Sequence, residues 1–120
     1  MNEAVRLLRA CVNSWDGIVR AIRTEAAVRT EVVLLALAVP VAATIADTPM
    51  RLVALIGSLL VLLAVELLNT AIEKLCDRVQ PDHDPAIKYV KDLGSAAVTT
   101  AVLLAAGTWG AIAWEIFVRR

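Results

Sequence analysis

The sequence has few of the residues on which many small proteins depend for stability or chemistry. Its two cysteines, Cys11 and Cys76, lack the spacing of a metal site, so neither a disulfide framework nor a zinc centre is expected. Aromatic residues are scarce, with three Trp, one Tyr and one Phe. No short apolar core with a small-residue cleavage site lies near the N-terminus, so we expect no removable signal peptide.

Apolar residues dominate what is present. They make up 59% of the 120 residues, and the mean hydropathy is +0.71. This composition indicates a small membrane protein with one domain, residues 1–120. Twelve Lys and Arg balance twelve Asp and Glu, so the net charge predicts no nucleic-acid partner.

One carboxylate, Glu66, interrupts a stretch that is apolar and long enough to cross a bilayer. A charge in the middle of a spanning helix costs about 2.5 to 3.5 kcal/mol on insertion scales, and such residues usually face a protein interior or a polar cavity. At about 100° per residue, Asn69, Glu73 and Asp77 fall on the same helix face. We call these four residues the polar stripe, and they form the first candidate site.

Hydrophobic periodicity predicts an all-α membrane protein with an amphipathic surface helix followed by three transmembrane helices. Apolar residues recur in steps of three and four over about residues 4–23, while other faces carry arginines. Such a helix suits the membrane interface, although packing on its own bundle is an alternative. The spans are expected at about 30–46, 52–72 and 95–118. Pro40 is expected to kink the first of them.

Three spans place the N-terminus and the loop from Pro81 to Pro85 on one side of the membrane. The Lys and Arg residues of that side are Arg6, Arg9, Arg20, Arg23, Arg29, Lys74, Arg78, Lys88 and Lys91. Those of the other side are Arg51, Arg119 and Arg120. Because positive charge favours the cytoplasmic side, we expect the N-terminus and the polar end of the second span to be cytoplasmic.

More charged residues gather near the same surface. Besides the stripe, these are the acids Glu25, Glu31 and Asp92 and the bases Arg6, Lys88 and Lys91. Carboxylates suit Mg²⁺ and basic groups suit phosphate, and phosphoryl transfer needs both, with a base or orienting group for the attacking hydroxyl. The chain has no Gly-rich loop ending in Lys-Ser or Lys-Thr and no protein-kinase catalytic loop. Any nucleotide site must therefore be of another design.

Three segments carry a resemblance to a known family. They are ELLNTAIE (66–73) followed by Asp77-Arg78, KDLGSAAV (91–98), and EAAVRTE (25–31). Together with Ser14-Trp15, the chain length and the order of elements, they resemble the signature of the prokaryotic integral-membrane diacylglycerol kinases. Asn13 and Asp16 depart from the family pattern, which usually has an aromatic and a basic residue there.

The resemblance implies a homotrimer with shared active sites in the bacterial cytoplasmic membrane, with the sites on the cytoplasmic side. It implies transfer of the γ-phosphate of MgATP to diacylglycerol, giving phosphatidic acid, with Glu66 as catalytic base and Glu25 and Glu73 as Mg²⁺ ligands. The nucleotide-binding residues would be Arg6, Ser14, Glu25, Asn69, Glu73, Asp77, Lys91 and Asp92. The substrate-binding residues would be Arg6, Glu31, Glu66 and Ser95.

Three alternatives remain open from the sequence. A structural or regulatory membrane peptide is one, but it would leave the cost of Glu66 unexplained. Relatives on the same scaffold resemble undecaprenol kinases, but these tend to have Ala at the position of Ser95, which favours diacylglycerol. A small proton-coupled transporter also carries one membrane carboxylate, but it would not need the surrounding acids and bases. His83, beside solvated acids and prolines, is expected to be a loop residue rather than a ligand.

Overall fold

A computed structural model describes residues 2–119, which form four α-helices and, within that range, no strand. The helices are α1 (Glu3–Thr24), α2 (Ala26–Ile45), α3 (Pro49–Val79) and α4 (Pro85–Val118). Three of them, α2, α3 and α4, are long and apolar enough to cross a membrane. The prediction of an all-α protein is therefore confirmed, with three helices that could form the expected spans. Arg120, counted above among the basic residues of the second side, lies outside the described residues.

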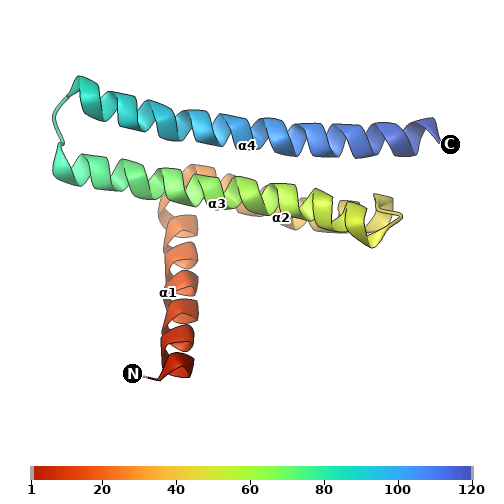
Figure 1. Ribbon diagram of the computed structural model, residues 1–120, viewed down its shortest axis with the longest axis horizontal. Helices are drawn as coiled ribbons and strands as arrows, with labels where there is room; N and C mark the ends of the chain where they lie inside the picture. Colours follow the sequence, from red (N-terminus) through yellow and green to blue (C-terminus); the bar gives the residue numbers. More distant parts are fainter. Residues whose placement is uncertain (1, 120) are drawn as a thin grey trace.

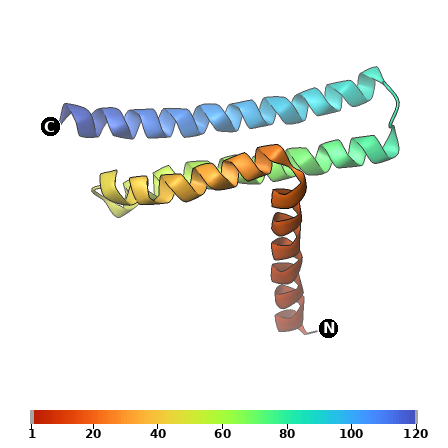
Figure 2. The ribbon, with the colours of Figure 1, turned by 180° about the vertical axis from the view of Figure 1, so that it is seen from behind.

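The three long helices run alongside one another, and α1 leaves them at a steep angle (Figure 1). The central helix is α3, which contacts both α2 and α4. Seen from behind, α1 again points away from the other helices (Figure 2). At about 1.5 Å per residue, the 31 residues of α3 span about 46 Å, more than the roughly 30 Å of a hydrocarbon core. The helix is therefore longer than one perpendicular crossing of that layer requires.

Local capping explains where the last two helices begin. The side chain of Thr48 accepts a hydrogen bond from the backbone N–H of Arg51, and Pro49 takes the first turn of α3. Asp84, the residue before α4, likewise accepts hydrogen bonds from the backbone N–H groups of Ala86 and Ile87 in the first turn of that helix. Pro85, predicted to close the loop, is thus the first residue of α4. The segment with Lys88 and Lys91 is helical and continuous with the third span.

The joint between α1 and α2 consists of one non-helical residue, Glu25. Beside it, the guanidinium of Arg29 donates hydrogen bonds to the carbonyl oxygens of Ile22, at 3.0 Å, and of Arg23, at 3.4 Å. These carbonyls belong to the last turn of α1, where a cation offsets the unpaired C-terminal groups of the helix. Arg29 therefore fixes the direction in which α1 leaves the bundle, and no residue of α1 is buried.

Small and branched side chains form the core. The buried cluster consists of Ala38, Leu59, Leu62, Ala101 and Ala105. These residues come from all three long helices. The alanines among them allow the helix backbones to approach closely. Pro40 lies within α2, which continues past it to Ile45.

Polar contacts set the register of α3 against α4. At the far end from the polar stripe, Arg51 pairs with Glu115 at 2.5 Å and with Asp47 at 2.7 Å, and only 16% of its side chain is exposed. Further along, the indole N–H of Trp109 donates to the carbonyl oxygen of Leu55 at 3.0 Å. Trp109 lies in the second half of the third expected span, a position typical of an interfacial aromatic belt, and the structure packs it half-buried against the core cluster.

This contact leads to a prediction about stability. Replacing Trp109 with Phe should lower the free energy of unfolding by about 1 kcal/mol, because the indole hydrogen bond to the Leu55 carbonyl oxygen is lost, although the Ser58 hydroxyl still donates to that oxygen. The matched control is Trp114→Phe on the same helix, since that side chain is 68% exposed. Unfolding of both variants in mixed micelles titrated with denaturing detergent measures the difference. Equal stability of the two variants would contradict the assigned role of Trp109.

Candidate active site

The polar stripe begins in the buried middle of α3. Glu66 is 7% exposed and Asn69 is 8% exposed, whereas Glu73 and Asp77 are exposed. The hydroxyl of Thr70 donates to Oε1 of Glu66 at 3.5 Å, and Nδ2 of Asn69 donates to Oε1 of Glu73 at 3.3 Å. Both bonds join residues one turn apart, as the helix dictates. The stripe therefore leads from a buried carboxylate to solvent.

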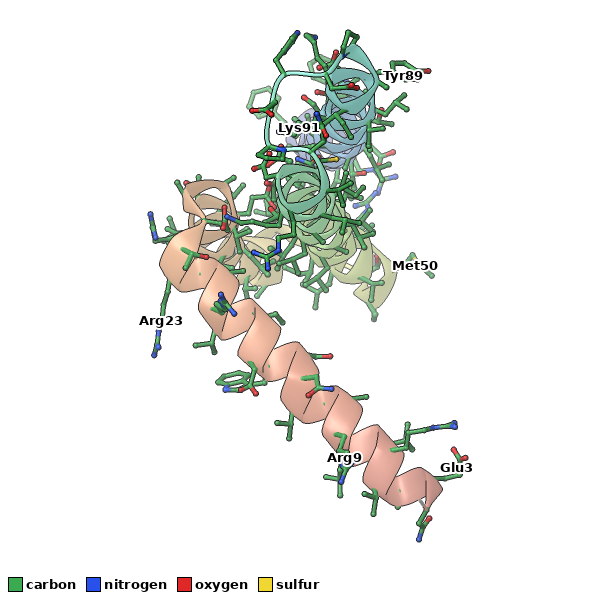
Figure 3. The ribbon with its side chains drawn as sticks, turned by 90° about the vertical axis from the view of Figure 1, so that its left-hand side faces the viewer. Glu3, Arg9, Arg23, Met50, Tyr89 and Lys91 are labelled. Atoms are coloured by element: carbon green, nitrogen blue, oxygen red, sulfur yellow. The ribbon has the colours of Figure 1, made fainter. Side chains whose placement is uncertain are left out.

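At the exposed end of the stripe, α4 contributes a cation. Nζ of Lys91 donates to Oδ1 of Asp77 at 2.6 Å. Figure 3 looks along the long helices from this end and shows Lys91 between α3 and α4, while Tyr89 points away. Asp92, the next residue, pairs with Lys88 at 2.7 Å, and both side chains are exposed. Of the predicted nucleotide residues, the structure thus brings Lys91 and Asp77 together.

The joint between α1 and α2 brings a further carboxylate to α3. Oε1 of Glu25 lies 2.8 Å from Nζ of Lys74 and accepts a hydrogen bond from the hydroxyl of Thr24 at 3.2 Å. The hydrogen bond from Lys74 lowers the pKa of Glu25 below its ordinary value of 4.5. Because the pKa of Glu25 is lower in the folded protein than its ordinary value, the pair with Lys74 stabilises the fold at pH values above 4.5. This stabilisation is lost as the pH falls through the pKa of the folded state. At neutral pH Glu25 is therefore ionised.

Glu31 faces the same region from the first turns of α2. It is half-buried, and its Oε2 atom is buried with no hydrogen-bond partner among the described residues. The charges of Glu31 and Glu66 interact, and those of Glu25 and Glu73 also act on Glu66. Carboxylates from α2, α3 and the joint before α2 are therefore close enough to Glu66 for their charges to act on it. We call Glu25, Glu31, Glu66 and Glu73 the acidic cluster.

The acidic cluster fits a hard divalent cation by its chemistry. Carboxylate oxygens are the ligands that Mg²⁺ prefers. The buried Oε2 atom of Glu31 has no hydrogen-bond partner among the described residues, so it is free to act as such a ligand. Within residues 2–119, however, no three His, Cys, Asp or Glu side chains are already arranged as a metal site. The cluster therefore offers carboxylate oxygens suited to Mg²⁺, and the described residues form no preformed metal site.

Two predicted site residues lie elsewhere in the chain. Arg6 pairs with Glu3 at 2.7 Å near the start of α1, and the hydroxyl of Ser14 donates to the carbonyl oxygen of Ala10 at 2.8 Å. Because α1 points away from the long helices, the structure does not bring Arg6 or Ser14 to the polar stripe of their own chain (Figure 3). Ser95, predicted to bind the lipid, is an exposed residue of α4.

Sequence reasoning missed three residues at this site. Thr70 lies one turn after Glu66, so helical spacing alone signals that contact. Lys74 had been assigned only to the basic side of the membrane, because its pairing with Glu25 depends on how the helices pack. Gly94 is a small residue of the kind that allows helices to approach closely, but the sequence does not show that its partner is Asn69, against which it is buried.

Fold and site together define a short helical membrane protein with an acidic cluster that includes a buried carboxylate of the central long helix and is paired with a lysine. The chain belongs to the prokaryotic diacylglycerol kinase family, whose model matches residues 12–113. The diacylglycerol kinase of Escherichia coli strain K12 is 38% identical over 112 residues, covering 93% of this chain and 92% of the relative.

Two further relatives agree with this family membership. The diacylglycerol kinase of Pseudomonas aeruginosa is 39% identical over 107 residues, covering 89% of this chain and 87% of the relative. That of Haemophilus influenzae is 31% identical over 106 residues, covering 88% and 90%. The similarity therefore extends over nearly the whole of each relative.

Proposed function

We propose that this protein is a lipid kinase that transfers the γ-phosphate of MgATP to the free hydroxyl of diacylglycerol, giving phosphatidic acid. The observation that carries the proposal is the buried Glu66, together with the other carboxylates of the acidic cluster, in a chain whose relatives are named diacylglycerol kinases. A structural role alone would leave the cost of a carboxylate inside a span without compensation.

Glu66 is the proposed general base. Its carboxylate takes the proton of the lipid hydroxyl as that oxygen attacks the γ-phosphorus, and ADP leaves with the electrons of the broken bond. The Thr70 hydroxyl orients Oε1 of Glu66. The depth of Glu66 within an apolar span suits an acceptor hydroxyl whose acyl chains stay in the bilayer.

The rest of the site is proposed to hold the nucleotide. Glu25 and Glu73 would hold Mg²⁺, which supplies neutralising charge to the phosphates when bound. Lys91 has three donors, so it can keep its bond to Asp77 while it contacts a phosphate oxygen. Arg6, Ser14, Asn69 and Asp92 are the other proposed nucleotide residues, and Glu31 and Ser95 are proposed to line the lipid site with Arg6.

We also propose that the single domain, residues 1–120, assembles as a homotrimer with shared sites in the bacterial inner membrane. The direction of α1 supports sharing, because it carries Arg6 and Ser14 away from their own stripe. Exposed Leu8 and Trp15 among the arginines of α1 support a place in the membrane interface. The excess of Lys and Arg supports a cytoplasmic N-terminus and active site.

A comparison of two lipids tests the substrate assignment. With labelled γ-phosphate of MgATP in mixed micelles, kcat/KM for dioleoylglycerol should exceed that for undecaprenol at least about tenfold, a difference of about 1.4 kcal/mol in transition-state binding. Equal or better use of undecaprenol would overturn diacylglycerol as the substrate while leaving a lipid kinase on this scaffold. Phosphorylation of neither lipid would favour the transporter.

A further inference from the structure

Gly94 lies where no other residue type would fit without disturbing a neighbour. It is buried on α4, and a Cβ built on it would overlap Oδ1 of Asn69 and lie 3.3 Å from Cγ of the same side chain. The other glycines differ, since a Cβ would meet nothing within 4 Å at Gly17, Gly57, Gly107 or Gly110. Within the described chain, close approach therefore requires glycine only at position 94.

The chemistry of Asn69 fixes which end of its amide faces Gly94. An ionised carboxylate only accepts hydrogen bonds, so Asn69 must direct Nδ2 toward Oε1 of Glu73. Oδ1 is then the atom that occupies the space beside Gly94, where it is buried without a hydrogen-bond partner among the described residues. A buried amide oxygen without a donor is unfavourable, so the shape of the site holds it there.

The ion pair between Lys91 and Asp77 sets the level of Gly94 along α3. Lys91 and Gly94 are three residues apart, so they are neighbours on one face of α4. Their partners on α3, Asp77 and Asn69, follow in the opposite order along the chain, as an antiparallel pair requires. The salt bridge and the glycine contact therefore belong to one interface between α3 and α4.

We propose that Gly94 is a positioning residue for the kinase reaction, because its bare backbone holds the Asn69 amide against Glu73 for nucleotide binding. This inference rests on the proposed function. Gly94 does not touch substrate. It acts through Asn69, whose amide is the link between the buried part of the polar stripe and the proposed Mg²⁺ ligand.

A methyl group at position 94 should displace Asn69 rather than unfold the protein. The atoms it would meet, Oδ1 and Cγ, belong to a side chain that can rotate, and Cβ of Asn69 is 4.0 Å away. Rotation moves the amide away from Glu73 and breaks the 3.3 Å hydrogen bond. The Gly94→Ala protein should therefore fold, but its Asn69 amide should no longer lie against Glu73.

Steady-state kinetics of the single and double variants at positions 94 and 69 test whether Gly94 acts through Asn69. Gly94→Ala should raise the KM for MgATP at least fivefold and leave the KM for dioleoylglycerol within twofold, and Asn69→Ala should do the same. In the Asn69→Ala background, Gly94→Ala should change neither constant by more than twofold, because the clashing atoms are gone. Gly110→Ala on the same helix is the control with unchanged kinetics. Additive losses in the double variant would overturn the proposal.

An independent signal comes from the side-chain amides. The chain has three asparagines, Asn2, Asn13 and Asn69, so selective ¹⁵N-asparagine labelling gives three side-chain NH₂ groups. Gly94→Ala should shift the Asn69 signals and leave the other two in place. Unchanged Asn69 signals would overturn the contact. If the wild type phosphorylates no lipid, the proposed function and this role for Gly94 both fail, whereas the spectra still decide whether Gly94 positions Asn69.

Discussion

Glu66→Gln is expected to lower the rate of phosphatidic acid formation at least about a hundredfold, within the range that general-base catalysis contributes. Glutamine has the same shape and can still accept the hydrogen bond from Thr70, but its amide cannot take the proton of the lipid hydroxyl. Steady-state transfer of labelled γ-phosphate to dioleoylglycerol in mixed micelles measures the loss. The KM for MgATP should stay within about threefold of the wild-type value.

The matched control is Glu115→Gln, which makes the same change at the opposite end of the bundle. Glu115 pairs with Arg51, and Arg51 keeps Asp47 as a second partner after the change. Activity of this control should remain within about twofold of wild type. A Glu66→Gln protein that is folded and retains a tenth or more of the wild-type rate would rule out Glu66 as the base.

Glu73→Gln should raise the Mg²⁺ concentration needed for half-maximal activity at least about tenfold, because one anionic ligand of the proposed cation becomes neutral. It should also lower kcat at saturating Mg²⁺, since phosphoryl transfer depends on that charge being held in place. The glutamine oxygen can still accept from Asn69, so the position of the amide is preserved. Activity titrated with Mg²⁺ at fixed ATP gives both constants.

The same control applies to the metal titration. Glu115→Gln removes one carboxylate far from the acidic cluster, so its Mg²⁺ requirement should match that of the wild type. If Glu73→Gln lost activity without any change in Mg²⁺ dependence, the residue would act on Asn69 alone and the metal assignment would be wrong.

Much of the fold could be predicted from the sequence because it depends on local patterns. The apolar runs predicted three helices long enough to span a membrane, and the expected loop from Pro81 to Pro85 ends at the observed start of α4. The periodicity of about residues 4–23 corresponds to α1, Glu3–Thr24. Each of these signals lies within a few residues of the feature it predicts.

The contacts between helices could not be predicted in the same way. Trp109 and Trp114 look alike in the sequence, yet only Trp109 donates to Leu55 and packs on the core, because helix rotation decides which side faces α3. The ion pair between Lys74 and Glu25 could not be predicted either. It depends on how α2 packs on α3 and on the angle between α1 and α2, which are joined by the single non-helical residue Glu25.

The candidate site shows the same division. The polar stripe follows from helical spacing on α3, and its burial at Glu66 and Asn69 agrees with the expectation that a membrane carboxylate faces protein. The approach of Gly94 to Asn69 depends on two helices and has no signature in either one alone. The roles of these residues in catalysis and metal binding remain predictions.

The most direct test of the proposed function is to reconstitute the wild-type protein in liposomes with dioleoylglycerol and to supply γ-labelled MgATP. Chromatography of the lipids should show the label in phosphatidic acid, with one ADP formed for each labelled lipid. ATP consumed without labelled lipid, or no ATP consumed while the protein moves protons across the membrane, would contradict a lipid kinase with its base at Glu66.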